Sequence, residues 1–440
     1  MAISAAEFSE RRRALLSQCE PNSLCIVAAN SLVTRSNDTE YPFRQNSDFW
    51  YLTGFNEPEA YLLLSNKGTS DKQAETSYMF VQPTDAFAEV WHGRRLGVEA
   101  AKKALQVSHA FDVEEIDEYL ADIIDGHQHL YYSFDDRPAV ESTISLALAE
   151  CRNAPKQTKL APNHVHDIQP LIHGMRLIKS DAEITVMQEA ASISCLAHRR
   201  AMQFSAPGKF EYHLEAELLH EFAMNGARYP AYGTIVGSGD NACILHYTEN
   251  CSELHDGDLV LIDAGCELHG YAADITRTFP VNGKFNDTQK TLYQLVLDSQ
   301  KAALDVLIPG KTISEAMQAC VRVIVEGLLE LGILSGTLES NIENETWRVF
   351  FMHGLGHWLG LDVHDVGIYK INGEDRPLEA GMVMTVEPGL YIPESADVEQ
   401  KFKGIGIRIE DNIVLTETGH RNLTENAPKE IDDIEALMAK

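Results

Sequence analysis

The sequence predicts an α/β protein of two domains, the second of which is built from two similar halves. Three observations lead to this class. The chain has 440 residues, more than one ordinary domain holds. Short apolar runs alternate with helical patterns over roughly the first 150 residues. A pattern of glycines and acids then occurs twice in the C-terminal half. We place the boundary so that residues 1–175 form the first domain and residues 176–440 the second.

The charge of the chain excludes several classes of partner. It has 36 Lys and Arg against 66 Asp and Glu, a formal net charge of −30. We therefore expect no nucleic-acid partner and no anionic membrane surface, because both bind basic patches. The longest apolar runs, at 24–30 and 259–264, are shorter than the ~20 residues that span a bilayer. No apolar leader segment is evident and the eight cysteines include no CxxC pair, so we expect a reducing, cytoplasmic location.

Local patterns predict the elements of the first domain. Residues 5–18 form a polar helix, and residues 23–29 and 59–65 form strands. The stretch 152–169 contains two prolines and few periodic apolar residues, which predicts a linker or an irregular crossover.

The second domain opens with a well-marked helix. Ser180 is followed three residues later by Glu183, which is the signature of a capping box. A second helix is predicted over 211–225 and further helices over 287–333, with strand-rich sequence before and after the latter range.

An internal repeat places four acids at matching positions. In each half, a buried strand ends on an acid six residues after a glycine, and a second segment carries an acid four residues after another glycine. Two such matches predict a pseudo-two-fold domain with one site near its axis. The pairs are Gly257 with Asp263, Gly270 with Asp274, Gly381 with Glu387, and Gly406 with Glu410.

A hairpin in the first half brings two of these acids together. If Glu267–Gly270 is the turn, Asp263 lies opposite Asp274, and facing residues on paired strands have Cβ atoms ~5 Å apart. Two metal ions that share ligands lie ~3.5–4 Å apart. The hairpin therefore suits a two-cation site, although a solvated hairpin with two surface acids remains the alternative.

A glycine-rich segment adds three histidines within twelve residues. Each glycine in a helix interior costs ~1 kcal/mol relative to alanine, so we expect a loop that directs imidazoles into a cleft. The histidines are His353, His357 and His364, and the glycines are Gly354, Gly356 and Gly360.

Together these segments predict a set of metal ligands. Four carboxylates and one neutral imidazole carry four negative charges, which two divalent cations balance. Such an oxygen-rich set favours Mn²⁺, Co²⁺, Fe²⁺ or Zn²⁺ over a thiolate zinc site. The sequence has no HExxH, GxSxG or Walker motif to indicate another chemistry. The predicted ligands are Asp263, Asp274, His357, Glu387 and Glu410.

These segments closely resemble the pita-bread metallopeptidases, and the aminopeptidase P (Xaa-Pro aminopeptidase) family in particular. The segments of the second domain are LIDAGCELHGYAADITRTF, HGLGHWLGLDVHDVG, TVEPGLYI and GIGIRIEDNIV. YPFRQNSDFWYLTGFNEPEA, EVWHGRRLG and CILHYTEN add to the resemblance, which covers nearly the whole chain. It implies a creatinase/prolidase-type α/β domain followed by a pita-bread catalytic domain.

The resemblance implies hydrolysis of the bond between an N-terminal residue and a proline in the second position. Prolidase, an Xaa-Pro dipeptidase, is the alternative, because it shares both domains and all five ligands. Creatinase lacks these ligands, and methionine aminopeptidase usually lacks the large N-terminal domain. A catalytically silent peptide-binding protein is the alternative from another class, but such members usually lose a ligand and none is lost here.

The resemblance also implies roles for the ligands. Asp263 binds one ion, Asp274 and Glu410 bridge both, and His357 with Glu387 binds the other. The expected cofactor is two divalent ions per subunit, with Mn²⁺ as the first expectation. A hydroxide that bridges the ions is the implied nucleophile.

Further side chains receive roles from the same resemblance. His364 polarises the scissile carbonyl, Glu387 moves the proton, and His246 and His353 belong to the substrate pocket. Tyr232 hydrogen-bonds a metal-binding carboxylate, and Arg408, which shares a strand face with Glu410, supports that acid.

The substrate side of the site raises two further points. An X–Pro bond has no N–H to hold, so the ring must be recognised by shape. The resemblance implies that Trp91 reaches a neighbouring subunit's cleft, in a homotetramer built as a dimer of dimers, whereas a buried core tryptophan is the alternative. Gly233 departs from the family pattern, in which a larger polar residue follows the tyrosine.

Overall fold

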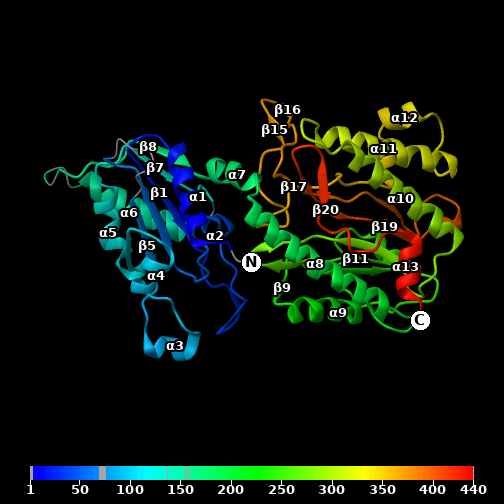
Figure 1. The fold of residues 1–440 in the computed structure, drawn as a ribbon, viewed down its shortest axis with the longest axis horizontal. Helices are drawn as coiled ribbons and strands as arrows, with labels where there is room; N and C mark the ends of the chain where they lie inside the picture. Colours follow the sequence, from blue (N-terminus) through cyan, green and yellow to red (C-terminus); the bar gives the residue numbers. More distant parts are fainter. Residues whose placement is uncertain (1–2, 69–75, 136, 154–155, 157, 440) are drawn as a thin grey trace. The chain divides into compact units, whose positions relative to one another are not determined.

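The computed structural model describes residues 3–68, 76–135, 137–153, 156 and 158–439. The chain divides into two compact units, one ending at Arg176 and one beginning at Leu177 (Figure 1). Both units contain helices and sheets, so the predicted α/β class is confirmed. No helix within the described ranges is long and apolar enough to cross a membrane.

The N-terminal unit is organised around one six-stranded sheet, in the order β6-β5-β4-β1-β7-β8. Its strands are β1 (Ser23–Ala28), β4 (Tyr61–Ser65), β5 (Thr76–Val81), β6 (His109–Asp112), β7 (His129–Tyr132) and β8 (His164–Asp167). β1 pairs antiparallel with β4 and parallel with β7. β8 pairs parallel with β7 at one edge.

The linker or irregular crossover predicted over 152–169 is partly wrong, because β8 lies inside it. Residues 154, 155 and 157 of this stretch lie outside the described residues. Val165 is the one aliphatic residue of this four-residue strand, and it is exposed. A short edge strand of this kind has no alternation of buried and exposed residues from which it could be predicted.

Seven helices of the described N-terminal sequence accompany this sheet. They are α1 (Ala5–Gln18), α2 (Ser47–Thr53), α3 (Ala86–His92), α4 (Val98–Ala104), α5 (Ile116–Ile124), α6 (Pro138–Asn153) and α7 (Gln169–Leu177). The predicted helix over 5–18 is confirmed, and Ser4 caps it by accepting a hydrogen bond from the Glu7 N–H. Leu24, Ile26 and Leu130 of the sheet share a buried core with α5 and α6.

Long helices frame the C-terminal unit. They are α8 (Asp181–Phe204), α9 (Glu211–Met224), α10 (Asp287–Val306) and α11 (Ile313–Glu330), with the shorter α12 (Leu338–Glu343) and α13 (Ile431–Met438). The capping box predicted at Ser180 and Glu183 is confirmed, since both of its hydrogen bonds are present.

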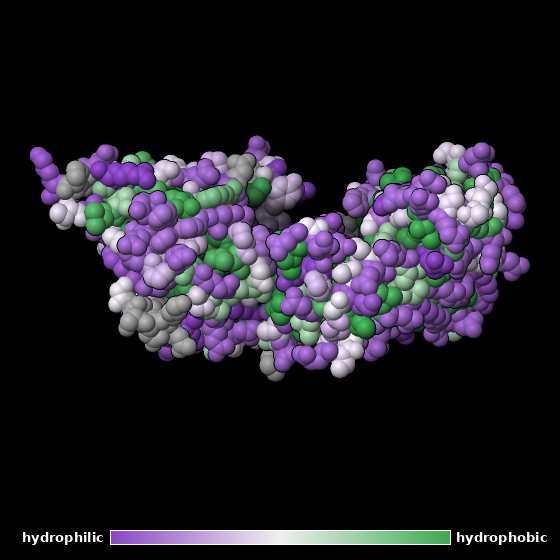
Figure 2. Space-filling view, turned by 90° about the horizontal axis from the view of Figure 1, so that it is seen from above, coloured by the Kyte–Doolittle hydropathy of each residue, from purple (hydrophilic) through white to green (hydrophobic). Residues whose placement is uncertain are grey.

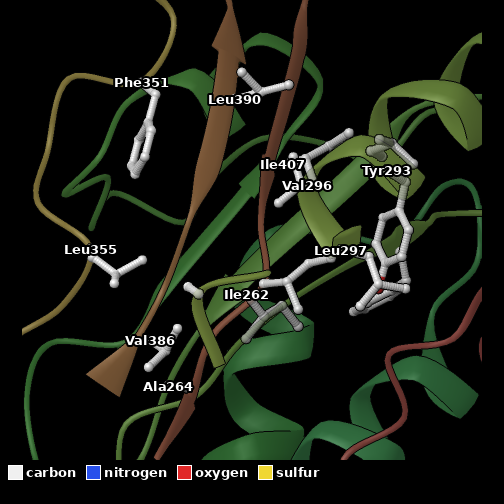
Figure 3. Packing of buried hydrophobic residues seen from close by; sticks show 14 of the residues in the cluster. Ile262, Ala264, Tyr293, Val296, Leu297, Phe351, Leu355, Val386, Leu390 and Ile407 are labelled. Atoms are coloured by element: carbon white, nitrogen blue, oxygen red, sulfur yellow. The ribbon is translucent and has the colours of Figure 1, made fainter. Parts of the chain in front are cut away.

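The strands of this unit form two groups that correspond to the two halves of the repeat. The first half contributes β10 (Ile235–Ser238), β11 (Leu259–Asp263) and β14 (Thr276–Pro280), with β11 in the middle. The second contributes β17 (Val383–Val386) paired with β20 (Asp411–Leu415), and β18 (Gly389–Ile392) paired with β19 (Ile405–Arg408). Both groups share one core with α10, in which Ile262, Val296, Leu297 and Ile407 are buried (Figure 3).

The register of the predicted hairpin differs from our expectation. Asp263 faces Thr276, not Asp274. The turn lies one residue later than predicted, because His269 and Gly270 both have positive φ, at 50° and 85°, as a two-residue type I′ turn requires. This turn joins β12 (Cys266–Leu268) to β13 (Tyr271–Ala272). Asp274 therefore lies in the break between β13 and β14.

Hydrophilic residues cover most of the face of the molecule that Figure 2 shows, and hydrophobic residues form small separate groups on it. This distribution agrees with the large excess of acidic residues in the sequence.

Candidate metal centre

One cavity of the C-terminal unit collects nearly all of the predicted site residues. It has a volume of about 500 Å³. Ten of the eleven side chains predicted from the sequence line it: Tyr232, His246, Asp263, Asp274, His353, His357, His364, Glu387, Arg408 and Glu410. These residues come from segments separated by up to 178 positions, between Tyr232 and Glu410, so only the fold brings them together.

Three of the four acids reach the cavity because each lies at or next to the end of a strand, and Asp274 reaches it from the break between β13 and β14. Asp263 is the last residue of β11, and Glu387 directly follows β17. Glu410 directly precedes β20. The strands themselves are buried, whereas their ends open onto the cavity. The repeat in the sequence thus delivers carboxylates from both halves to one place.

Tyr232 connects the two acids of the first half. Its hydroxyl oxygen lies 2.6 Å from Asp263 Oδ1 and 2.5 Å from Asp274 Oδ1. A phenol carries one proton and donates one hydrogen bond at a time. With both carboxylates ionised, one of these contacts joins two oxygens without a proton between them. A cation bound to the carboxylates relieves that repulsion.

His357 presents a nitrogen to the carboxylates. Its Nδ1 donates to the carbonyl oxygen of Trp358 at 2.9 Å, which leaves Nε2 facing Asp274 Oδ2 at 3.4 Å and Glu387 Oε1 at 3.6 Å. Burial lowers the pKa of His357, but the Asp274 hydrogen bond and the nearby charges outweigh it and raise the pKa to about 9. A backbone partner on one nitrogen, with the second nitrogen directed at the carboxylates, is the usual arrangement of a metal-binding histidine.

The pKa values of the acids indicate that the cavity has too little positive charge to balance its four carboxylates. Burial raises the pKa of Asp263 to about 6 and that of Glu387 to about 7. Burial and the neighbouring acids raise the pKa of Glu410 well above its ordinary range. For Asp274, burial is outweighed by the hydrogen bond from His357, and its pKa is lowered. Ionising all four acids at neutral pH therefore needs added positive charge.

The donor atoms are close enough to share a cation. Ligand atoms of Asp274, His357 and Glu410 all lie within 4.8 Å of one another. Carboxylate oxygens with one imidazole suit divalent ions of the Mn²⁺ type. The residues present therefore fit a metal centre on chemistry, charge and distance.

Arg408 is buried and hydrogen-bonds to three side chains at the cavity. It donates to Asp263 Oδ2 at 2.6 Å, to the Tyr391 hydroxyl at 3.0 Å and to Thr276 Oγ1 at 3.0 Å. Thr276 in turn donates to Glu410 Oε2 at 2.6 Å. We expected Arg408 to support Glu410. Its direct carboxylate contact is instead with Asp263, and it reaches Glu410 through Thr276.

The three histidines on the cavity wall differ in their surroundings. His353 lies 2.8 Å from both the Gly354 carbonyl oxygen and the Tyr391 hydroxyl. Burial and the charge of Arg408 lower its pKa to about 4, so it is neutral. His364 is exposed and packs edge-on against His357, with ring centroids 4.4 Å apart. His246 is exposed on the same cavity. The predicted loop over 353–364 is confirmed, since no helix forms there.

Trp91 is the one predicted site residue outside this cavity. It lies on α3 of the N-terminal unit and is 71% exposed, with Phe87 as an edge-on ring neighbour. The alternative of a buried core tryptophan is therefore wrong.

Comparison with known proteins decides the family. The model of metallopeptidase family M24 matches residues 185–417, more than half of the chain. The chain belongs to metallopeptidase family M24.

Part of the N-terminal half of this M24 chain matches a second family model. The N-terminal domain of aminopeptidase P matches residues 8–131. The chain is 52% identical to the Xaa-Pro aminopeptidase of Escherichia coli over 99% of this chain and 98% of that protein. It is 49% identical to the Xaa-Pro aminopeptidase of Haemophilus influenzae, over 98% and 97% of the two chains.

Solved structures agree with the sequence matches. The zinc-substituted E. coli aminopeptidase P in complex with product superposes with a TM-score of 0.97 at 51% identity, covering 100% of this chain and 99% of that one. The resemblance to aminopeptidase P that the sequence indicates is confirmed.

Several supporting residues of this M24 site were not predicted. Asn412 accepts from the backbone N–H of Asp274 at 3.0 Å, and its amide donates back to the Asp274 carbonyl oxygen. Tyr391 joins His353 to Arg408, and Thr276 joins Arg408 to Glu410. The alternating strand patterns place Thr276 and Arg408 on defined faces, but nothing in the sequence pairs them.

Proposed function

We propose that this M24 chain is a metal-dependent Xaa-Pro aminopeptidase, which releases the N-terminal residue from peptides with proline in the second position. The observation that carries the proposal is the composition of one cavity. It holds four carboxylates and one imidazole of the ligand type, together with three further histidines on its wall. The similarity to Xaa-Pro aminopeptidases along the whole chain indicates which peptide bond such a centre would cleave.

The ligands divide naturally between two divalent ions, for which Mn²⁺ is the proposed metal. Asp263 would hold one ion, His357 and Glu387 the other, and Asp274 and Glu410 both. Two divalent charges balance the four carboxylates that burial otherwise resists ionising. When bound, such ions supply Lewis-acid chemistry, activating water and polarising the peptide carbonyl.

The protein's own side chains would then handle the substrate. His364, exposed at the cavity beside His357, donates a hydrogen bond to the carbonyl oxygen as negative charge develops there. His246 and His353 line the space for the residues around the scissile bond. Tyr232 and Arg408 hold Asp263 in place by direct hydrogen bonds.

Glu387 is the residue proposed to move the proton. Its carboxylate is at the cavity, within 3.9 Å of His353 Nδ1 and 3.6 Å of His357 Nε2. It would accept a proton from the attacking water and deliver it to the proline nitrogen. That delivery is essential for an X–Pro bond, because its nitrogen carries no hydrogen and leaves only once protonated.

The assembly and location are proposals as well. An apolar ring that is 71% exposed on a helix without buried residues is suited to an interface. We propose that Trp91 completes the proline side of a neighbouring subunit's cleft in a homotetramer, a dimer of dimers. In this proposal residues 1–175 serve oligomerisation and form a wall of the cleft, and residues 176–440 carry catalysis. Eight free cysteines suit a reducing cytoplasm.

One pair of substrates tests the activity. The Mn²⁺-loaded protein is expected to release arginine from Arg-Pro-Pro. Cleavage of the dipeptide Gly-Pro with no cleavage of Arg-Pro-Pro would instead identify a prolidase. Cleavage of neither, in protein with full metal content, would reject both activities and support a peptide-binding role.

A further inference from the structure

Three histidines lie close together at one edge of the sheet in the N-terminal unit. The carboxylate cavity belongs to the C-terminal unit. His129 lies on β7, and His164 and His166 lie on the edge strand β8. The strand register pairs His129 with His164 and Tyr131 with His166. Because alternate residues of a strand point to the same side, all four side chains share one face of the sheet.

The three imidazole rings are in mutual contact. The centroid of the His129 ring lies 4.8 Å from that of His164 and 5.2 Å from that of His166. His129 Nδ1 is 3.0 Å from His166 Nε2. Tyr131 is buried and stacks on His166, with ring centroids 4.4 Å apart, so it packs against one side of the cluster. His164 is exposed, whereas His129 and His166 are half-buried.

The surroundings of His129 favour its neutral form, which is the form of an imidazole that binds metals. Burial lowers the pKa of His129, and the neighbouring His164 and His166 lower it further, with Glu20 as the opposing charge. Each neutral ring offers one nitrogen lone pair. A metal holds an imidazole nitrogen at ~2.0–2.1 Å. Two ligands of one ion therefore lie about 3 Å apart or slightly more, close to the separation already present between His129 and His166.

We propose that His129, His164 and His166 form a second metal site, which takes one divalent ion of the Zn²⁺, Ni²⁺ or Cu²⁺ class. A set of nitrogen donors suits these ions better than Mn²⁺, Mg²⁺ or Ca²⁺, which prefer oxygen. The carboxylate cavity offers mainly oxygen donors, which also suit Mn²⁺, so the two sites differ in the range of metals they accept. An ion bound here would link the edge strand β8 to β7 through its histidine ligands.

Binding requires two adjustments, because the His164 ring is stacked on His129 with an interplanar angle of 13°. The proton shared between His129 Nδ1 and His166 Nε2 moves, through solvent, to the other nitrogen of the donor ring, so both lone pairs face the ion and no net charge changes. The exposed His164 turns about its side-chain torsions to bring its nitrogen to the same point. Exposed side chains change rotamer within nanoseconds. Solvent water completes the coordination.

Nickel binding tests this site directly. Untagged full-length enzyme, saturated with Mn²⁺, is dialysed against Ni²⁺ in excess Mn²⁺, and both metals are counted per chain. The test variant is His164→Asn/His166→Asn. The matched control is His109→Asn, because His109 lies on β6 at the opposite edge of the same sheet and also stacks on a tyrosine, Tyr78, at 5.1 Å.

We expect one tightly bound Ni²⁺ per chain in the native enzyme and in the control, and its loss in the double variant. Mn²⁺ content and hydrolysis of Arg-Pro-Pro should be the same in all three, which separates this test from that of the proposed function. Equal Ni²⁺ binding by the native enzyme and a folded double variant would overturn the site.

A second variant covers the case in which the double variant fails to fold. His164→Asn alone alters an exposed side chain, and it should weaken Ni²⁺ binding by at least the ~10–100-fold that loss of a ligand's hydrogen-bond partner costs. With Cu²⁺ as the probe, electron paramagnetic resonance should show coupling to three nitrogens in the native enzyme and two in this variant. Unchanged Ni²⁺ affinity and unchanged nitrogen coupling in His164→Asn would reject the proposal.

Discussion

Arg408 Nη2 lies 2.6 Å from Asp263 Oδ2, and both side chains are largely buried. The arginine comes from the second half of the repeat and the aspartate from the first. This ion pair therefore joins the two halves at the wall of the cavity. It also orients a proposed metal ligand, because the other Asp263 oxygen is held by Tyr232.

Replacing this arginine should weaken the metal centre even though charge is kept. Arg408→Lys cannot donate to Asp263, Tyr391 and Thr276 at once. We expect a loss of ~10–100-fold in metal affinity or in kcat, as for other residues that orient metal ligands. Mn²⁺ titration followed by peptide hydrolysis measures both. Arg421→Lys, at an exposed arginine on the surface, is the control, and similar losses in both variants would contradict the role of Arg408.

His364 should affect the rate without affecting metal content. If it stabilises the developing oxyanion, His364→Ala lowers kcat by ~10²–10³, the usual loss for one such donor. His357→Ala, in contrast, should lose metal. Elemental analysis and steady-state kinetics on the two variants separate the roles. Metal loss in His364→Ala would make that residue a ligand and our assignment wrong.

Trp91 should contribute to substrate binding and not to stability. Trp91→Ala should raise KM for X–Pro peptides and leave the melting temperature near that of the native protein. A truncated core tryptophan costs ~3–5 kcal/mol of stability, which the 71% exposure of this side chain argues against. Phe87→Ala, at a 76% exposed residue of the same helix, is the matched comparison. An unchanged KM for Trp91→Ala in an intact oligomer would exclude the interface role.

The metal-free protein should lose stability as pH rises from about 6.5 to 8.5. In the folded state the pKa of Glu387 is raised to about 7 and that of His357 to about 9, so the folded protein holds more protons than the unfolded chain in this range. Its free energy of unfolding then falls with pH. The buried His127, His198 and His353 have folded pKa values near 4, so they oppose this slope close to the ordinary histidine pKa of ~6.5. Well above that pH they are neutral in both states and the opposing slope disappears.

Thermal melts in chelator and in Mn²⁺ measure this effect. Because metals bind deprotonated ligands, the increase in melting temperature caused by Mn²⁺ should be larger at pH 8.5 than at pH 6.5. The metal-free His357→Gln variant should show a smaller pH dependence. Stability that rises with pH over this window in the metal-free native protein would contradict the charge argument.

The sequence was sufficient to predict the strands that end on acids. It was not sufficient to predict the contacts between segments that are distant in the chain. Asp263 and Glu387 could be found because a buried strand followed by an acid is visible locally. The position of Asp274 was predicted with the wrong register, because a type I′ turn at His269 and Gly270 was not recognised. β8 could not be predicted, because its single aliphatic residue gives no alternation of apolar and polar positions. The hydrogen bond between Thr276 and Glu410 spans 134 positions, and no local pattern encodes it.

The central claim is that this chain needs two divalent ions to hydrolyse an X–Pro bond. The most direct measurement titrates verified metal-free protein with Mn²⁺ and follows release of arginine from Arg-Pro-Pro together with bound metal per chain. The account predicts no turnover without metal and full turnover as two ions bind. Asp263→Asn should be lower by several orders of magnitude, and Asp256→Asn, at an exposed acid that precedes β11, should be unchanged. Full turnover in the metal-free protein would contradict it.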